Sequence, residues 1–273
     1  MLRMRSDAAA AEGAVKAERE GPPALSFRNV TFSYEPDGEP VIRNLSAEIR
    51  RGEFVSLVGP SGCGKSTLFR LVNQLLPVTS GEILVDGQPI QERKNCCGYM
   101  PQQDLLFPWR SVAENVSLPL EIRGGFSKQE MRSMAEDVLR SVGLEGWEDR
   151  TPRELSGGMR QRAAFARTLL TGSDLLLLDE PFSALDYLTR LTLREWLLGQ
   201  WEQEHRTILF ITHDVEEAVF LSSRILAVTR APISALQSFP VPLPYPRTEE
   251  TMALPEAVSL KEELIHLLRR QRS

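Results

Sequence analysis

The nine residues Gly59–Thr67 have the composition of a loop that binds phosphate. They match the complete pattern G-x-x-x-x-G-K-[ST], and they stand between an apolar run and a predicted helix. In such a loop, glycines let backbone N–H groups converge on phosphate oxygens, and the following helix adds partial positive charge. Lys65 would reach the β- and γ-phosphates, and the Ser66 hydroxyl would bind Mg²⁺. The predicted nucleotide contacts are Gly59, Pro60, Ser61, Gly62, Cys63, Gly64, Lys65, Ser66 and Thr67.

Two further polar clusters follow apolar runs that are typical of buried strands. Asp179 and Glu180 come directly after Leu175–Leu178, so they are expected at the carboxyl edge of a sheet, where α/β proteins bind ligands. Asp179 would hold Mg²⁺ through water, and Glu180 is the best candidate to polarise an attacking water. His213 also ends an apolar run. It could hydrogen-bond the γ-phosphate, although a histidine that only caps the next helix is the alternative.

The octet Leu155–Arg162 reads Leu-Ser-Gly-Gly-Met-Arg-Gln-Arg and lies between the phosphate loop and the acidic strand end. It resembles the signature motif of the ATP-binding cassette (ABC) ATPases. In that family the motif acts on ATP held by the opposite subunit. The resemblance therefore implies a dimer in which each chain supplies half of each active site, most simply a homodimer.

The resemblance covers residues 24–230 and implies roles for further residues. Tyr34 corresponds to the aromatic residue that stacks on adenine, with local packing in a strand as the alternative. Gln102 corresponds to the glutamine that contributes to the Mg²⁺ site and links it to a helical subdomain; Gln103, next to it, is the alternative. Lys65, Gln102, Glu180 and His213 would thus carry hydrolysis, and Ser66, Gln102 and Asp179 would surround the Mg²⁺ ion.

Other residues would act across the dimer. The resemblance implies that Ser156, Gly157 and Gly158 contact the γ-phosphate of the ATP bound to the partner. Asp186, at the end of the run Ser183–Asp186, would contact the partner's site. Two ATP molecules would then lie between two subunits.

The segment Asp104–Val112, with its Phe107-Pro108-Trp109 core, is similar to that of importers of the nitrate, sulfonate and taurine group. Residues 159–170 also resemble members that import thiamine-precursor pyrimidines. The segment would pass motion to a separate permease, and a solute-binding protein would act indirectly. Core packing is the alternative for Phe107 and Trp109. The resemblance implies the ATP-binding and ATP-hydrolysing subunit of a bacterial importer, held at the cytoplasmic face of the membrane by its permease.

The elements that position these residues follow from hydrophobic patterning. Alternation predicts a strand within residues 24–35, and further strands are expected at 45–49, 54–58, 82–85, 98–100, 175–178, 207–212 and 224–229. Helices are expected at 65–76, 156–170, 187–204, 214–222 and 258–270, and Ser127 with Glu130 predicts a capped helix start. Apolar strands that alternate with helices predict a mainly parallel sheet covered on both faces. The expected fold is an α/β ABC ATPase core with N-terminal antiparallel strands and an inserted helical subdomain.

We expect three regions: a disordered leader (1–22), an ATPase domain (23–230, helical subdomain about 104–170) and a C-terminal tail (231–273). The tail is rich in proline and is expected to be extended or loop, outside the core, before its closing helix. Its role cannot be inferred from the sequence.

A net charge of −5 and a pI near 5.5 disfavour nucleic-acid binding. Three cysteines are too few for a disulfide framework, and we interpret Cys96 and Cys97 as filling a strand. Two other functions compete with the importer subunit. A soluble ABC ATPase acting as a scaffold or assembly factor is disfavoured by the single cassette and the Phe-Pro-Trp segment. An inactive regulatory subunit is disfavoured by the intact catalytic residues.

Overall fold

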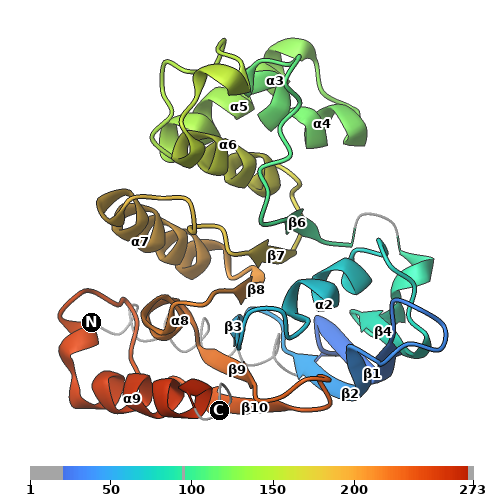
Figure 1. The fold of residues 1–273 in the computed structure, drawn as a ribbon. Coiled ribbons are helices and arrows are strands. Elements are labelled where there is room, and N and C mark those ends of the chain that lie inside the picture. The colour runs from blue at the N-terminus through green and yellow to red at the C-terminus, as the bar shows by residue number, and fades with distance from the viewer. Residues whose placement is uncertain (1–20, 94–95, 270–273) are drawn as a thin grey trace, which may run out of the picture.

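The computed structural model describes residues 21–93 and 96–269, and Figure 1 shows their arrangement. The predicted disordered leader lies almost entirely outside these residues. An antiparallel sheet, a mainly parallel sheet and a group of helices follow the order predicted from the sequence. In the described part of the chain, no helix combines the length and apolar character required to cross a bilayer.

The first sheet has the strand order β2-β1-β4-β5 and is antiparallel throughout. Its strands are β1 (Leu25–Phe32), β2 (Ile42–Ile49), β4 (Ser80–Val85) and β5 (Gln88–Pro89). Buried aliphatic residues of β1 and β2 pack on the phosphate-loop helix α2 (Lys65–Val72) within one hydrophobic cluster. This sheet therefore supports the adenine side of the predicted nucleotide site.

The second sheet has the order β10-β9-β3-β8-β7-β6. Its strands are β3 (Phe54–Val58), β6 (Gly98–Met100), β7 (Leu175–Asp179), β8 (Thr207–Ile211), β9 (Arg224–Val228) and β10 (Leu236–Pro240). All five residues of β3, β7 and β8 are buried, as expected for strands covered on both faces. The pairs among β3 and β6–β9 are parallel, so their carboxyl ends meet at one edge.

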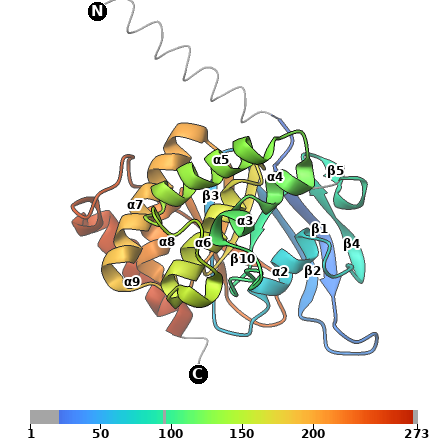
Figure 2. The same ribbon diagram turned by 90° about the horizontal axis from the view of Figure 1, so that it is seen from above.

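Four helices form the predicted helical subdomain, which lies above the sheets in Figure 1. They are α3 (Val112–Val116), α4 (Leu118–Arg123), α5 (Lys128–Ser141) and α6 (Gly157–Leu169). Ser127 and Glu130 form the predicted capping box of α5. Three further helices lie on the side of the molecule opposite the antiparallel sheet (Figure 2). They are α7 (Tyr187–Glu204), α8 (Val215–Leu221) and α9 (Pro255–Arg269). Single 3₁₀ turns occur at Ile90–Glu92, Pro152–Glu154 and Thr251–Ala253.

The C-terminal tail was predicted wrongly in one respect. Residues 236–240 are extended, as expected, and form β10, which pairs antiparallel with β9 and closes that edge of the sheet. The tail does not lie outside the core, because Phe239, Val241, Leu243 and Leu264 are buried in the main hydrophobic cluster. The prolines misled the prediction, since an edge strand tolerates proline at positions that donate no ladder hydrogen bond.

Arg247 anchors this tail. Its guanidinium is buried and donates to the carbonyl oxygens of Val219, Phe220 and Ser222, at distances of 2.7–3.0 Å. These are the carbonyl groups that the C-terminal end of α8 leaves without helical partners. The tail therefore caps α8 at the end opposite His213.

Candidate nucleotide site

The phosphate loop joins the buried strand β3 to helix α2, as predicted. Lys65 is almost completely buried, and its ammonium donates to the carbonyl oxygens of Gly59 and Pro60, both at 2.8 Å. Its Nζ also lies 3.8 Å from Cys63 Sγ. The lysine is thus held inside the turn of its own loop, with its charge at the N-terminus of α2.

Glycine is required at two positions of the loop for steric reasons. Gly64 has φ = 105°, and a Cβ at this position would lie 2.6 Å from Cγ1 of Val41. A Cβ at Gly59 would lie 2.9 Å from Cβ of Val228. Both contacts are far shorter than a normal van der Waals distance, so the loop can approach β9 and the 41–42 segment only without side chains.

Tyr34 lies beside the loop. Its ring is 56% exposed and packs edge-on against Phe32, with ring centroids 4.9 Å apart. Its hydroxyl is 3.0 Å from the Thr67 hydroxyl. The phenol is therefore fixed at one end while its face remains exposed, as required of a platform for a base.

Three adjacent strand ends bring the other predicted residues together. In the parallel register, Met100 of β6 pairs with Leu178 of β7, and Asp179 of β7 pairs with Ile211 of β8. Gln102 follows β6, Glu180 follows β7 and His213 follows β8. Because these strands are neighbours, three residues that are up to 111 positions apart in the sequence meet at one edge.

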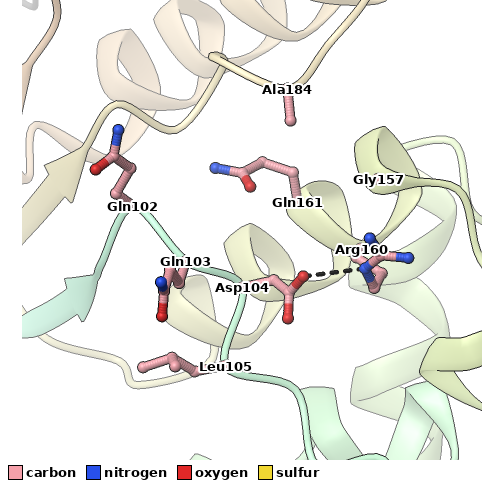
Figure 3. Close-up of a pocket in the computed structure, with 8 residues that line it drawn as sticks. All are labelled: Gln102, Gln103, Asp104, Leu105, Gly157, Arg160, Gln161 and Ala184. Carbon is pink, nitrogen blue, oxygen red and sulfur yellow. Dashed lines mark hydrogen bonds and ion pairs between the residues drawn. The ribbon is translucent and has the colours of Figure 1, made fainter.

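Gln102 and His213 both contact the Glu180 carboxylate, and they contact the same oxygen. Gln102 Nε2 donates to Glu180 Oε2 at 3.2 Å, and His213 Nδ1 lies 3.4 Å from that oxygen. Gln103 points in a different direction (Figure 3). Glu180 itself has φ = 50°, and its N–H donates to Ile211 O at 2.9 Å.

Asp179 and Ser66 provide a set of oxygen ligands. Asp179 is 3% exposed, and its carboxylate lies close to the Ser66 hydroxyl. Burial raises the pKa of Asp179 above its usual value, and the hydrogen bond to Ser66 and the charge of Lys65 oppose this shift. A buried carboxylate beside a hydroxyl is a pair of hard oxygen donors that suits Mg²⁺.

The predicted cross-dimer residues form a separate surface. Ser156 caps α6 by accepting from Met159 N at 3.2 Å, and Ser156 and Gly157 are exposed. Gly158 faces the 184–185 loop, where a Cβ would lie 3.4 Å from Ala184 O. Asp186 is exposed and caps α7 through Thr189 N at 3.1 Å. Among the described residues, no side-chain hydrogen bond joins this surface to the phosphate loop.

Sequence reasoning missed the contacts that connect these parts. A cavity of about 370 Å³ lies between the segment after Gln102, the start of α6 and Ala184 (Figure 3). At its wall Arg160 Nε donates to Asp104 Oδ2 at 3.0 Å. Arg167 donates to the carbonyl oxygens of Asp104 and Leu105, at 2.6 and 2.8 Å. The sequence offered one signal for these contacts, namely the basic residues Arg160 and Arg167 in the helix that begins within the octet.

Gln161 was also missed. It is 4% exposed, and its Nε2 donates to the backbone carbonyl of Glu180 at 3.4 Å. Gln161 therefore connects α6 to Glu180, the residue that Gln102 and His213 both contact.

The loop 107–111 is held by Asn115, whose side chain is completely buried. Its Oδ1 accepts from Phe107 N at 2.7 Å, and its Nδ2 donates to the carbonyl oxygens of Phe107, Arg110 and Ser111. Trp109 is nevertheless 75% exposed, and its ring centroid lies 5.1 Å from that of Phe107 in a tilted arrangement. Core packing is therefore wrong as an explanation of Trp109, while Phe107 is half-buried.

Comparison with known proteins identifies the family of this chain. Residues 42–183 match the family model described as ABC transporter. The chain is 45% identical over 246 residues to the formylaminopyrimidine import ATP-binding protein ThiZ of Halalkalibacterium halodurans, covering 89% of this chain and 96% of the relative. It is 40% identical over 225 residues to the aliphatic sulfonates import ATP-binding protein SsuB of Bacillus cereus, covering 82% and 88%.

Solved structures show the same fold. The ATP-binding cassette MJ0796, as a dimer in a post-hydrolysis state with ADP and Pi, superposes with a TM-score of 0.72 at 30% identity, covering 80% of this chain and 98% of that one. The Clostridium perfringens protein cbiO1 gives a TM-score of 0.70 at 24% identity over 92% and 99% of the two chains, which supports the fold alone. The chain belongs to the ABC transporter family and is one of its ATP-hydrolysing cassettes.

Proposed function

We propose that this chain is the ATPase subunit of an importer, in which two cassettes sandwich two Mg-ATP and drive a separate permease. The observation that carries the proposal is the meeting of Gln102, Glu180 and His213 at one carboxylate oxygen, at the edge of the sheet that also presents the phosphate loop. A carboxylate with two flanking polar groups can orient and polarise a water molecule.

The residues of the chain have distinct tasks in this proposal. Lys65 exchanges the carbonyl oxygens of Gly59 and Pro60 for the β- and γ-phosphates, and the N-terminus of α2 supports the same charge. Tyr34 offers its exposed ring to the adenine. Glu180 polarises the attacking water, and His213 holds its position relative to the γ-phosphate.

Mg²⁺ would be held by Ser66 and Asp179, with Gln102 beside them. When bound, the ion supplies charge neutralisation on the β- and γ-phosphate oxygens. Gln102 would exchange its contact with Glu180 for the metal site, and the segment that follows it leads directly to Asp104 and the helical subdomain.

In this proposal the second surface, formed by Ser156–Gly158 and Asp186, binds the nucleotide that the partner subunit holds. The exposed start of α6 presents backbone N–H groups and the positive end of a 13-residue helix, which suits an anion. The cassette MJ0796, solved as a dimer, is the precedent for such pairing. A homodimer satisfies both halves of the site with one kind of chain.

The substitution Glu180→Gln tests this site. It removes the charge of the carboxylate but preserves its shape, so ATP should still bind while hydrolysis stops and a dimer accumulates. Gel filtration with Mg-ATP, together with a phosphate-release assay, measures both effects. A variant that stays monomeric and hydrolyses ATP at the wild-type rate would refute the role of Glu180.

A permease contact is the second part of the proposal. Trp109 is exposed on a loop that Asn115 fixes rigidly, and Leu105 and Ile122 are exposed in the same subdomain. Exposed apolar side chains on a rigid loop are typical of a protein contact. The proposed partner is a cytoplasmic loop of the permease, which would place the cassette at the cytoplasmic face of the membrane.

The substitution Trp109→Ala should abolish co-purification with the permease and leave ATP binding intact. Leu75→Ala, which removes another exposed apolar side chain (63% exposed) near the end of α2, is the matched control. Equal recovery of the permease with both variants would contradict the contact.

The solute class is proposed from the relatives, which carry the names of formylaminopyrimidine and aliphatic sulfonate importers. Uptake assays with both classes, in cells lacking the gene, would separate them. A scaffold or assembly ATPase is the second candidate, and it predicts that ATPase activity is unaffected by any permease and by Trp109→Ala.

A further inference from the structure

Cys96 and Cys97 form a pair of sulfur atoms that the nucleotide chemistry does not use. They were predicted to fill a strand, but β6 begins only at Gly98. Adjacent side chains of an extended strand point to opposite faces. Here the two Sγ atoms are 4.0 Å apart, so both thiols lie on the same side of the backbone.

The more buried thiol of the pair is anchored. Cys97 Sγ donates to Asn73 Oδ1 at 3.2 Å, and the orientation of that amide is set by Asn73 Nδ2, which donates to Phe69 O at 3.0 Å. Asn73 is the C-terminal cap of α2. The cysteine pair therefore contacts the far end of the helix that begins at the phosphate loop.

The two thiols differ in acidity. The side-chain contact with Cys97, with a contribution from the charge of Arg93, lowers the pKa of Cys96 to about 7. The same contact and burial raise the pKa of Cys97 above its usual value. At neutral pH the partly exposed Cys96 thus exchanges between thiol and reactive thiolate, beside a protonated Cys97.

The pair can supply two ligands but not four. Within residues 21–93 and 96–269, no cluster of three or more His, Cys, Asp or Glu side chains is arranged to hold a metal ion, and a structural zinc site needs four ligands. Two bonds of about 2.3 Å, the length of a zinc–thiolate bond, span up to about 4.6 Å between sulfur atoms. A single soft centre that requires only two protein sulfurs fits the pair.

We propose that Cys96 and Cys97 form a vicinal dithiol site for a trivalent arsenical that carries one organic group. In the reaction R–As=O + 2 RSH → R–As(SR)₂ + H₂O, two As–S bonds form and the oxygen leaves as water with both thiol protons. No electron is transferred, so no oxidant is required. The organic group completes the three bonds of the arsenic.

Occupation of this site has a consequence at the nucleotide loop. Once bonded to arsenic, Cys97 has no S–H to donate, and the hydrogen bond to Asn73 at the C-terminal end of α2 is lost. Binding should therefore cause a reversible loss of ATPase activity without contact with the nucleotide.

The test uses the reduced full-length chain and phenylarsine oxide, followed by a wash with a monothiol and measurement of the intact mass. Cys96→Ser and Cys97→Ser are the variants, and their melting temperatures check that they fold. One arsenical should stay on each wild-type chain, survive 2-mercaptoethanol and leave with 2,3-dimercaptopropanol. Each serine variant should lose the adduct in the monothiol wash, because one sulfur cannot chelate.

Two results would overturn the proposal. The first is a wild-type chain that retains no arsenical after the monothiol wash. The second is an adduct that persists in both serine variants, which would show that the pair is not required for binding. ATPase activity measured on the same samples should fall in the wild type and recover with the dithiol, and it should not respond to the arsenical in Cys97→Ser.

Discussion

Replacing Asp104 by Asn should slow ATP hydrolysis while leaving ATP binding nearly unchanged. Asp104 Oδ2 accepts from Arg160 Nε at 3.0 Å, and Oδ1 accepts from Leu106 N at 3.2 Å. Asparagine keeps an oxygen for Leu106 but turns an NH₂ group toward Arg160. The substitution therefore removes the ion pair and preserves the local turn.

The expected magnitude follows from the exposure of the pair. The two side chains are 31% and 37% exposed, so solvent screens the attraction, and exposed pairs contribute about 0.2–1 kcal/mol. The charge-assisted hydrogen bond places this pair near the upper limit, at about 1 kcal/mol. Because the pair joins the segment after Gln102 to the start of α6, its loss should reduce kcat about fivefold.

A double-mutant cycle measures this coupling. Steady-state hydrolysis and nucleotide affinity are compared for Asp104→Asn, Arg160→Gln and the double variant. The double variant should be no slower than Arg160→Gln alone, which also loses the bond from Arg160 to Leu155 O. Asp149→Asn, which removes a partner of Arg132 at an 84% exposed position of the same subdomain, is the matched control and should not change the rate.

Two outcomes would refute this reasoning. Rate losses that multiply in the double variant would show that Asp104 and Arg160 act independently. An equal effect of Asp149→Asn would show that any charge change in the helical subdomain slows the enzyme.

Three further predictions concern the site and the tail. Gly64→Ala should weaken ATP binding tenfold or more, on the order of 1–3 kcal/mol of strain, because its Cβ would lie 2.6 Å from Val41 Cγ1 at φ = 105°; calorimetric titration measures it. Asp179→Asn should abolish hydrolysis yet stabilise the fold at pH 7. Burial raises the pKa of Asp179, so the cost of its charge is present above the raised pKa and absent below about pH 4, the ordinary aspartate range; urea unfolding at both pH values checks this. Arg247→Met should cost about 2–4 kcal/mol, since buried carbonyl groups lose their donor, whereas Arg140→Met, in an exposed ion pair, should cost less than about 0.5 kcal/mol in the same assay.

The sequence predicted the bounds of secondary structure best for buried strands and capped helices. The bounds of β3, β6 and α7 agree with the predicted ranges 54–58, 98–100 and 187–204, because buried strands and capped helices carry strong local signals. The helix predicted at 65–76 ends instead at Val72. Asn73 caps the helix, and Gln74 has the left-handed conformation with φ = 57°. No sequence pattern predicted this conformation at Gln74.

The candidate site was predictable as a set of residues but not as an arrangement. Periodicity placed Glu180 and His213 at strand ends, but only the strand order brings them and Gln102 to one oxygen. Contacts such as Gln161 with the Glu180 carbonyl, or Arg247 with α8, join residues far apart in sequence. They depend on tertiary packing, which local propensity does not encode.

The capping of α8 by Arg247 connects the C-terminal tail to the helix that follows His213. Helix α8 begins two residues after His213, and α9 packs on it. A domain fused after α9, or a protein that binds that helix, would be connected to His213 through only α9 and α8. This end of the chain is therefore a place to attach an external control that contacts neither the phosphate loop nor Trp109.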